Sequence, residues 1–471
     1  MNKTIKTDIC VIGAGSGGLS VAAGAAQMGA RVVLVEGGKM GGDCLNTGCV
    51  PSKSLIAAAA QAHAMTSGAP FGIAPVDPVV DYPAVVDHVA GVIAGIAPHD
   101  SVERFTGLGV EVIESMGKFI SNTELAAGDT IIRARRFVIA TGSVAMVPPI
   151  PGLETVPFDT NETIFTRSRQ PEHLLVIGGG PIGMELSQAH RRLGSRVTVI
   201  EGLTALHRED PEIAAIALDN IRAEGVQLFE NELVSEIRGE SGAIEVLTRN
   251  GDIHQGTDLL IAVGRRPATE NLGLAEAGVR SEVQGIAVND AMKTTNPRIY
   301  AIGDVTGGMQ FTHAAGYQAG IVIRSALFGL RSRAATAHIP RATFTDPEIA
   351  QVGLTEAQAR QAHGANLEVA RFAFAGSDRA RAERRTDGMI KVMVMKGRPV
   401  GVSIVGRQAG ELIALWSLAI SNRLKMKSIA SMVAPYPTMA EVNNRVAGAY
   451  FGPRLFENRW IKRAVRLVQR F

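Results

Sequence analysis

The sequence predicts an α/β protein that contains two similar βαβ units and ends in a separate α+β domain. Two observations predict the βαβ units. A β-branched strand, a glycine turn and an Ala-rich helix follow one another in residues 8–38, and the same order returns in residues 173–202. A third observation predicts the last domain, because from residue 341 a strand joins a helix and a later stretch has the pattern of an antiparallel strand pair.

The length and composition are those of a soluble multidomain protein. A chain of 471 residues is too long for one hydrophobic core, and 46% hydrophobic with 20% charged residues is ordinary for a globular protein. The first residues have no apolar run of the signal-peptide type, and no stretch of about 18 apolar residues follows. Three cysteines in so long a chain argue against a secreted disulfide scaffold. We therefore expect a cytoplasmic protein.

The charge is small but unevenly distributed. The formal net charge is +3, of which residues 454–471 contribute +5, so the first 453 residues carry −2. The body of the chain is therefore not expected to bind nucleic acid, and only its last segment is basic.

The first βαβ unit contains a glycine pattern that fits a dinucleotide. Gly13, Gly15 and Gly18 follow the G-x-G-x-x-G spacing, in which the first glycine permits a tight turn and the second lets a pyrophosphate approach. The third lets the helix pack on the strand. The phosphates are expected at the helix N-terminus, and Glu36, at the end of the next strand, is placed to accept hydrogen bonds from a ribose.

The second unit repeats this pattern. Gly178, Gly180 and Gly183 have the same spacing, and Glu201 follows the first of them by 23 residues, as Glu36 follows Gly13. One such pattern is weak evidence, because any glycine-rich turn can imitate it. Two copies that each end in an acid predict two dinucleotide sites on Rossmann-like domains.

Other segments complete the organisation. Residues 134–143, 257–267 and 297–305 each read as a buried strand that breaks at a glycine, as happens where a sheet approaches a cofactor. The Pro-rich stretch 146–157 predicts a boundary before the second nucleotide domain. Near residue 341 the pattern changes to a strand and a helix with Thr355 as a possible N-cap.

Two of the three cysteines lie in "GGDCLNTGCVPSK", residues 41–53. On a distorted first helical turn, Cys44 and Cys49 could come within bridging distance, with Gly48 and Pro51 holding the distortion. A helix N-terminus would favour a thiolate at Cys49. A metal pair and inert core cysteines are the alternatives, although the chain has no second Cys/His pair at ligand spacing. Cys10 lies in the middle of a strand and is expected to be a small buried residue.

The chain as a whole resembles the flavin-dependent pyridine nucleotide–disulfide oxidoreductases, which include lipoamide dehydrogenase, glutathione reductase and mercuric reductase. The stretch 41–53, "ATG" at 140–142 and "IGD" at 302–304 carry the resemblance. It implies two Rossmann-like dinucleotide-binding domains plus a C-terminal α+β dimerisation domain, and a homodimer. The implied segments are 1–147 and 271–340 for the FAD-binding and central part, 148–270 for NAD and 341–471 for the interface.

The resemblance also implies the roles of individual residues. Cys44 and Cys49 should form a redox-active disulfide beside FAD, with Cys49 facing the flavin and Cys44 meeting the substrate. Lys53 and Glu185 match an ion pair beside flavin N5, and Asp304 matches the acid that binds the ribityl chain. The residues expected at the FAD site are Gly13, Gly15, Gly18, Glu36, Gly42, Lys53, Gly117, Thr141, Gly142 and Asp304, and those at the nicotinamide site are Gly178, Gly180, Gly183, Glu201 and Gly264.

The nicotinamide cofactor is expected to be NADH. Glu201 suits a ribose 2′-hydroxyl and repels the 2′-phosphate of NADP(H). NADP-binding relatives usually place arginines just beyond this strand, whereas here Arg208 is the only arginine in "EGLTALHRED".

The resemblance breaks near the C-terminus. Lipoamide dehydrogenases and glutathione reductases carry His-Pro-x-x-x-Glu there, and the His of one subunit serves as acid/base at the disulfide of the other. Tyr436, Pro437 and Glu441 occupy the motif in this chain. The tyrosine resembles mercuric reductases, but these 471 residues contain neither a vicinal cysteine pair near the end nor a metal-capture domain. A phenol donates a proton at neutral pH but is a poor base.

The resulting functional prediction is an FAD-dependent NADH:disulfide-type oxidoreductase. Electrons would pass from NADH to FAD, to the Cys44–Cys49 disulfide and then to a small-molecule disulfide or another acceptor, with no metal site of its own. The alternatives are dihydrolipoamide dehydrogenase, which the missing base disfavours, a mercuric reductase-like metal or quinone reductase, and a redox flavoprotein without turnover.

The last residues predict a basic amphipathic helix. Trp460, Ala464, Leu467 and Phe471 recur at helical spacing, opposite a second set that comprises Arg459, Lys462, Arg463, Arg466 and Arg470. One interpretation is a helix packed on its own dimer with a solvated basic face. The other is attachment to anionic lipid, which would place the protein peripherally on the inner face of a membrane.

Overall fold

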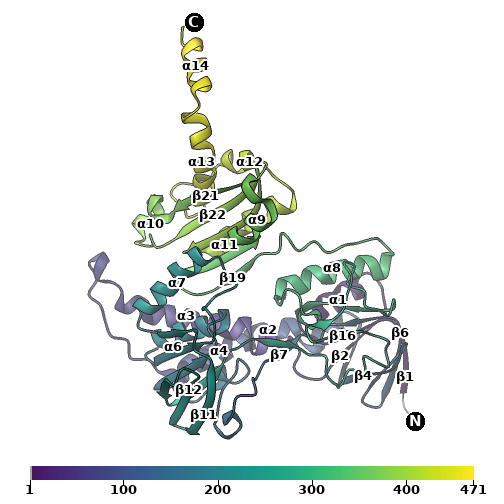
Figure 1. Cartoon of the computed structure of the whole chain (residues 1–471). Helices are drawn as coiled ribbons and strands as arrows, with labels where there is room; N and C mark the ends of the chain where they lie inside the picture. Colours follow the sequence, from purple (N-terminus) through teal and green to yellow (C-terminus); the bar gives the residue numbers. More distant parts are fainter. Residues whose placement is uncertain (1–2, 471) are drawn as a thin grey trace. The chain divides into compact units, whose positions relative to one another are not determined.

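The computed structural model describes residues 3–470 and divides them into two compact units (Figure 1). The first unit comprises the residues up to 178, residues 189–200 and residues 233–335. The second comprises residues 179–188, residues 201–232 and the residues from 336 onward. The four-segment division expected from the sequence stays a prediction, and Phe471 lies outside the described residues.

The largest sheet of the first unit has the strand order β3-β2-β1-β6-β5-β4, with β18 beside β6. β1, β2, β3, β6 and β18 run parallel, whereas β5 and β4 add an antiparallel meander. The bounds are β1 Lys3–Ile12, β2 Val32–Glu36, β3 Val110–Glu114, β4 Gly117–Ser121, β5 Glu124–Ala127, β6 Thr130–Ile139 and β18 Ile299–Ala301.

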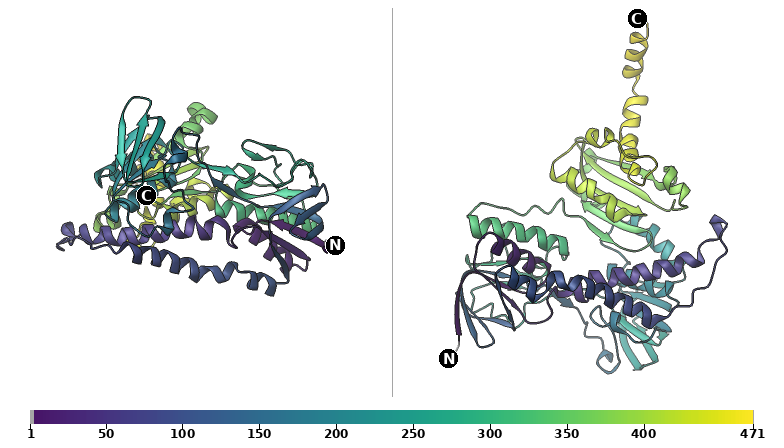
Figure 2. Two further views of the ribbon diagram at one scale, coloured as in Figure 1. Left: turned by 90° about the horizontal axis from the view of Figure 1, so that it is seen from below. Right: turned by 180° about the vertical axis from the view of Figure 1, so that it is seen from behind.

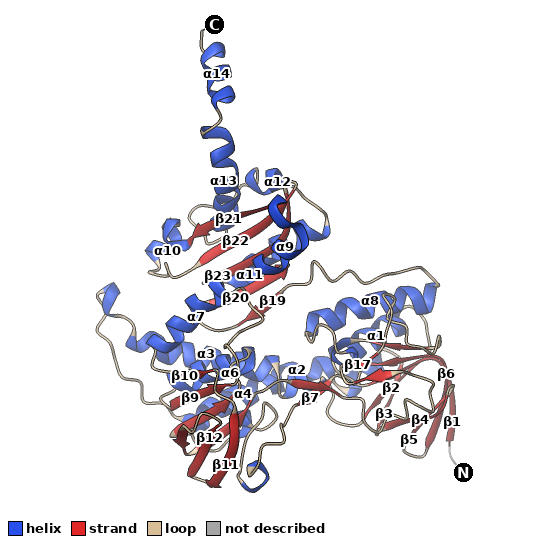
Figure 3. Cartoon of the chain, in the orientation of Figure 1, coloured by secondary structure: helices blue, strands red, loops and turns tan. Residues whose placement is uncertain are grey.

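Helices α1 (Ser16–Gln27) and α8 (Thr312–Phe328) lie side by side on one face of this sheet (Figure 3). The opposite face packs around Phe119 and Phe137, whose rings meet edge to face. Cys10 is fully buried in this second layer, and burial raises the pKa of its thiol. The prediction that Cys10 is a small core residue is confirmed.

The second predicted βαβ unit is present as well. β8 (His173–Ile177) pairs in parallel with β9 (Arg196–Glu201) and with β14 (Asp258–Ile261), and α6 (Pro181–Arg192) connects β8 to β9. The remaining elements of the first unit are α2 Gly42–Asn46, α3 Cys49–Thr66, α4 Tyr82–Ile96, α5 Val102–Gly107, β7 Ser143–Ala145, β11 Val234–Glu240, β12 Ala243–Thr248, β13 Ile253–Gly256, β15 Arg265–Pro267, β16 Ser281–Glu282 and β17 Gly285–Ile286.

The second unit is built on an antiparallel sheet of order β19-β20-β23-β22-β21. Thr355 caps α9 in a capping box and β22 pairs with β23, as the sequence predicts. The elements are α7 Pro211–Ala223, β10 Gln227–Glu230, β19 Arg341–Thr343, β20 Glu348–Gly353, α9 Glu356–His363, β21 Leu367–Ala373, α10 Asp378–Ala382, β22 Met389–Met395, β23 Arg398–Gly406, α11 Ala409–Ser421, α12 Met426–Ala430, α13 Glu441–Phe456 and α14 Arg459–Val468.

The two faces of this sheet differ in polarity because successive side chains alternate. Ile390 and Val392 belong to a core with α11 and α13 that contains the fully buried Trp416. The opposite face carries a polar row across neighbouring strands, because Lys391 lies in register with both Ser403 and Arg371.

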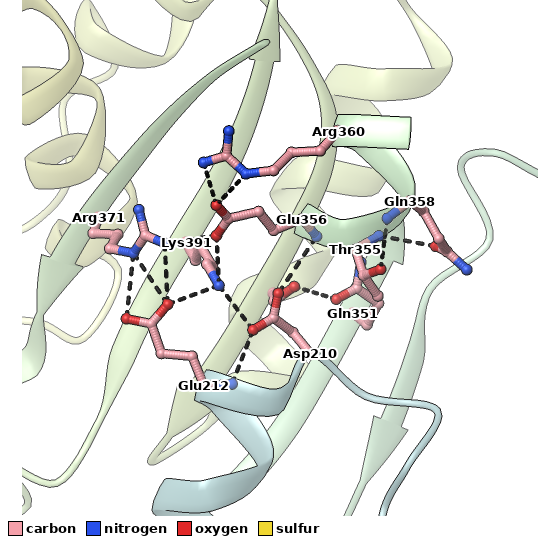
Figure 4. A network of polar contacts seen from close by, with 10 residues as sticks. Asp210, Glu212, Gln351, Thr355, Glu356, Gln358, Arg360, Arg371 and Lys391 are labelled. Atoms are coloured by element: carbon pink, nitrogen blue, oxygen red, sulfur yellow. Dashed lines mark hydrogen bonds and ion pairs between the residues drawn. The ribbon is translucent and has the colours of Figure 1, made fainter. Parts of the chain in front are cut away.

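The N-terminus of α7 contacts this polar row through ion pairs with Lys391 (Figure 4). The Nζ atom of Lys391 lies 2.8 Å from Asp210, 2.7 Å from Glu212 and 2.8 Å from Glu356, and its side chain is 4% exposed. Asp210 also caps α7 by accepting a hydrogen bond from the backbone of Glu212. Three carboxylates therefore compensate one buried ammonium group, which fixes residues 210–212 on the sheet.

Helix α14 follows α13 and extends away from the sheet of the second unit (Figure 2). All residues from 459 to 470 are exposed. Within residues 3–470, none of the helices combines the length and the apolar character needed to traverse a lipid bilayer.

Candidate redox-active site

The first glycine turn joins β1 to α1. Gly13 has a φ of 102°, and a Cβ there would collide with the carbonyl of Ala140. Open space surrounds Gly15, which precedes α1, whereas a Cβ at Gly18 would collide with the carbonyl of Gly13. The three glycines thus have the separate roles that a dinucleotide turn requires, and the space at Gly15 fits a pyrophosphate at the helix N-terminus.

The second glycine turn joins β8 to α6. Gly178 has a φ of 113°, and a Cβ there would collide with the carbonyl of Ala262. Open space again surrounds the second glycine, Gly180, and Gly183 lies in the first turn of α6. This site fits a second dinucleotide for the same reasons as the first.

The acids that end the two βαβ units have equivalent contacts. Glu36 accepts a hydrogen bond of 2.5 Å from the backbone N–H of Ala14, and Glu201 accepts one of 2.6 Å from that of Gly179. The other oxygen of each carboxylate accepts from the backbone N–H two residues further along the chain, at 2.6 Å and 2.8 Å. Each acid is therefore fixed beside its glycine turn, where the ribose of a bound dinucleotide is expected.

The cysteine pair lies on two consecutive helices. Cys44 belongs to α2, whereas Cys49 is the first residue of α3. The expectation of a single distorted turn is therefore wrong: the chain leaves the helix at Thr47 and re-enters it after Gly48. A Cβ at Gly48 would lie 2.9 Å from the backbone carbonyl oxygen of Asp43, so the break requires a residue without a side chain.

The two thiols have opposite shifts in acidity. The hydrogen bond from Cys44 lowers the pKa of Cys49 to about 6, with further support from Thr312 and from the charge of Lys53. The same hydrogen bond, together with burial, raises the pKa of Cys44. The Thr312 hydroxyl, on α8, lies 3.6 Å from the Cys49 sulfur. Both cysteines are free thiols here, so their disulfide stays a prediction.

A polar network connects Asp304 to the residue beside Cys44. The Ser143 hydroxyl donates to Asp304 over 2.6 Å, and Arg265 donates to that hydroxyl over 2.8 Å. The terminal Nη2 atom of the same guanidinium group lies 3.2 Å from the Asp43 carboxylate. Burial raises the pKa of Asp304, in spite of the hydrogen bond from Ser143. Asp304, expected to bind the ribityl chain, is thus tied to the segment that carries the thiols.

Sequence reasoning missed several members of this site, namely Asp43, Ser143, Asn161, Arg265 and Thr312. Asn161 donates to the Asp43 carboxylate over 3.2 Å and to the carbonyl of Thr47 over 3.1 Å. Three of them had a local signal, because Asp43 lies in the stretch 41–53, Ser143 follows "ATG" and Arg265 follows Gly264. Asn161 and Thr312 had no such signal.

The remaining predicted cofactor residues have differing environments. Gly142 has a φ of 71° with open space around it, and the Thr141 hydroxyl donates to the carbonyl of Ala268 over 2.8 Å. Gly42 and Gly264 have φ values of 60° and 131°. A Cβ at Gly117 would meet core side chains at 3.2 Å, which gives this glycine a packing role.

Lys53 and Glu185 lie in different units of the chain. The ammonium group of Lys53, on α3, donates to Ser52 over 3.3 Å. Glu185, on α6, is buried and accepts a hydrogen bond of 2.8 Å from the backbone of Phe344. Their pairing stays a prediction.

Two models of one protein family match this chain. Residues 7–319 match the family model described as pyridine nucleotide-disulphide oxidoreductase, and residues 339–447 match the dimerisation domain of the same family. The chain is a pyridine nucleotide-disulphide oxidoreductase. As a member of this family it is a flavin-dependent enzyme that acts on NAD(P)H, and the dimerisation domain indicates a homodimer.

Individual relatives of this oxidoreductase have differing names. A mercuric reductase of Streptomyces lividans is 34% identical over 92% of this chain and 94% of the relative. A dihydrolipoyl dehydrogenase of Thermus scotoductus is 35% identical over 92% of this chain and 95% of the relative. The Cu(II) complex of RclA, a HOCl-induced flavoprotein disulfide reductase of Escherichia coli, superimposes with a TM-score of 0.83 at 30% identity, covering 93% of this chain and 99% of RclA.

In this oxidoreductase, Tyr436 occupies an exposed loop of the second unit and Glu441 begins α13. The Tyr436 hydroxyl donates to Asp378 over 3.2 Å, and this hydrogen bond together with the Asp378 charge raises the pKa of the phenol. Glu441 lies 3.5 Å from Arg445. The phenol therefore stays protonated at neutral pH, as a hydrogen-bond donor. Its approach to the thiols of a partner subunit stays a prediction.

Proposed function

We propose that this enzyme transfers electrons from NADH through FAD to the Cys44–Cys49 pair, and that Cys44 passes them to an external acceptor. The observation that carries the proposal is that the pKa values of the two neighbouring thiols are shifted in opposite directions. Cys49, with a pKa of about 6, is a thiolate at neutral pH, whereas Cys44 stays protonated. A stable thiolate suits the thiol that faces a flavin, whereas Cys44 must give up its proton before it attacks an acceptor, because the thiolate is the nucleophile in exchange.

Bound FAD would supply the relay of electrons between a hydride donor and the thiols. Gly13, Gly15 and Glu36 are proposed to hold its pyrophosphate and ribose, and Asp304 its ribityl chain. The hydrogen bond from Cys44, with smaller contributions from Thr312 and the charge of Lys53, keeps Cys49 in the thiolate form. Tyr436 of a partner subunit would donate a hydrogen bond to the leaving thiolate of the acceptor, because a protonated phenol cannot collect a proton from an incoming thiol.

The preference for NADH is proposed from the loop after Glu201. The Glu201 carboxylate is fixed by two backbone N–H groups and would repel a 2′-phosphate. Ala205 and Leu206 are buried, which holds this loop in place, and Arg208 is exposed. The kcat/KM for flavin reduction should be at least about tenfold higher with NADH than with NADPH, and Glu201→Ala should narrow the ratio. A higher value with NADPH would contradict the assignment.

The acceptor reaction is tested by a screen of NADH oxidation against glutathione disulfide, lipoamide, quinones, Hg(II), Cu(II) and oxygen. A true acceptor should lose its reaction in Cys44→Ser, while rapid flavin reduction by NADH remains. Slow flavin reduction in the wild-type enzyme would instead favour a redox flavoprotein without turnover. An acceptor reaction that survives in Cys44→Ser, as a quinone taking electrons directly from flavin would show, contradicts the thiol route.

A second candidate function is the reduction of a soft metal ion. The mercuric reductase relatives and the copper complex of RclA favour it, because thiolates bind such ions. Here Cys44 and Cys49 would bind the ion as substrate. NADH-dependent loss of Hg(II) or Cu(II), absent in Cys44→Ser, would support this reaction over disulfide reduction.

The low cysteine content also leads us to propose a cytoplasmic location, since three cysteines in 471 residues argue against a secreted disulfide scaffold. Fractionation of cells that express the full chain tests this location. Recovery of the protein outside the cytoplasmic membrane would contradict it.

A further inference from the structure

The C-terminal helix α14 is amphipathic and has no covering layer in the second unit. Projected at 100° per residue, its basic side chains occupy an arc of about 100° and its apolar side chains an arc of about 160°. The basic set is Arg459, Lys462, Arg463 and Arg466, continued by Arg470 in the turn after the helix, and the apolar set is Trp460, Ile461, Ala464, Val465, Leu467 and Val468. All these residues are exposed. Trp460, at the border of the two arcs, is 74% exposed and lies 5.2 Å from the guanidinium of Arg463.

The chain just before α14 is anchored, so the helix begins at a defined place. Arg454 pairs with Glu368 of β21 and lies 3.8 Å above the ring of Tyr450. Asn458 then caps α14 by accepting from the backbone N–H groups of residues 460 and 461, at 2.9 Å and 3.3 Å. Because α14 is capped and the chain before it is held by Arg454, the helix exposes its apolar arc to solvent. An exposed apolar surface of this kind is typical of a binding site for another molecule or a membrane.

We propose that α14 lies on the surface of an anionic lipid membrane, with its apolar arc in the acyl boundary and its basic arc among the headgroups. The charge of this segment favours an anionic membrane, because residues 459–470 contain five positively charged side chains and no acidic one. A tryptophan on the apolar face of a helix whose other face is rich in Lys and Arg is typical of interfacial helices. The match to the family's dimerisation domain ends at residue 447, before α14 begins.

The test uses the full chain with FAD and sedimented vesicles of phosphatidylcholine, alone or with about 30% phosphatidylglycerol. The intact protein should bind the anionic vesicles and lose binding at high salt, while a chain that ends at Glu457 should not bind. Lys462→Gln with Arg466→Gln should weaken binding at least about tenfold. Arg331→Gln with Arg333→Gln, which removes the same charge from another exposed segment, is the matched control and should bind normally.

Trp460 provides an independent readout. Since Trp416 is fully buried, a blue shift of tryptophan emission on adding vesicles would come from Trp460 entering the interface. Flavin reduction by NADH should be unchanged in the shortened chain. Absence of binding by the intact protein at low salt, or equal binding by the shortened chain, would overturn the proposal. It would also fail if shortening converts the dimer to a monomer, because α14 would then pack on a second copy.

Discussion

The acidity of the thiols depends on single hydrogen bonds. Cys49 receives one from Cys44 and one from Thr312, and both lower its pKa. A hydrogen bond to a charged group contributes about 1.5–3 kcal/mol, which corresponds to about one to two pKa units. Each donor can therefore be tested by removing it alone.

Cys44→Ala should raise the pKa of Cys49 by at least about one unit, whereas Cys44→Ser keeps a donor and should change it less. The sign follows from the direction of the shift: the thiolate forms above a pH of about 6 in the wild type, and at higher pH in the alanine variant. The rate of alkylation of Cys49 against pH measures this change. Thr312→Val should act in the same direction, with Thr312→Ser as its control.

The two cysteines should also differ in their effect on the spectrum. Cys44→Ser leaves the Cys49 thiolate, so the long-wavelength charge-transfer band between thiolate and flavin should persist. Cys49→Ser removes the donor of that band, which should disappear. Equal spectra would overturn the assigned roles of the two thiols.

Tyr436 should determine which thiol reactions are practical. Its phenol is held protonated by Asp378, so NAD⁺-dependent oxidation of dihydrolipoamide should be very slow in the wild type. Tyr436→His should raise that rate if Glu441 can orient the imidazole, while Tyr436→Phe should impair the acceptor reaction and spare flavin reduction by NADH. Wild-type oxidation of dihydrolipoamide as fast as in histidine-bearing relatives would favour a dihydrolipoamide dehydrogenase.

At the scale of elements, the polar row under α7 should make the second unit sensitive to acid. Burial alone would raise the pKa of Glu212 and Glu356, but the hydrogen bonds and charges of Lys391 and the neighbouring arginines together outweigh it, so both pKa values lie below 4.5. Carboxyl groups with lowered pKa stabilise the fold above their unfolded pKa, and this stability is lost as the pH falls through the lower folded value.

Lys391→Met should therefore destabilise the protein by about 3–5 kcal/mol near neutral pH, because Asp210 would keep a buried charge without its partner. The loss should diminish as the pH falls below 4.5, where Glu212 and Glu356 accept protons. Chemical denaturation at several pH values measures both effects, with Lys391→Arg as the charge-conserving control. A loss that is independent of pH would mean that packing, and not the ion pairs, stabilises this junction.

At the scale of the whole molecule, the proposed site requires two chains. A co-expressed hybrid of a Cys44→Ser subunit and a Tyr436→Phe subunit, purified through two different tags, contains one intact site if Tyr436 acts across the dimer. Its acceptor activity should be about half that of the wild type, whereas each parent homodimer should be much less active. A hybrid no more active than the parents would place Tyr436 in the site of its own chain, and a fully active monomer would remove the need for a dimer.

The sequence alone predicted the parts of the enzyme that depend on local backbone constraints. Gly13 and Gly178 need positive φ, Gly15 and Gly180 need open space, and each βαβ unit ends in an acid that accepts hydrogen bonds from the backbone. These requirements concern residues that are near in sequence, so spacing reveals them. The cysteine pair was recognisable for the same reason, although the break at Gly48 was not.

The tertiary structure decided the contacts that join distant segments. Thr312 reaches Cys49 across 263 positions of the chain, and Arg265 connects Asp43 with Ser143. Lys391 could not be recognised as the centre of an ion network, because its partners come from α7 and α9 and meet it only when the strand register is formed. Spacing encodes what one turn or strand can do, whereas hydrogen bonds between separate elements depend on how those elements pack, and no local pattern carries that information.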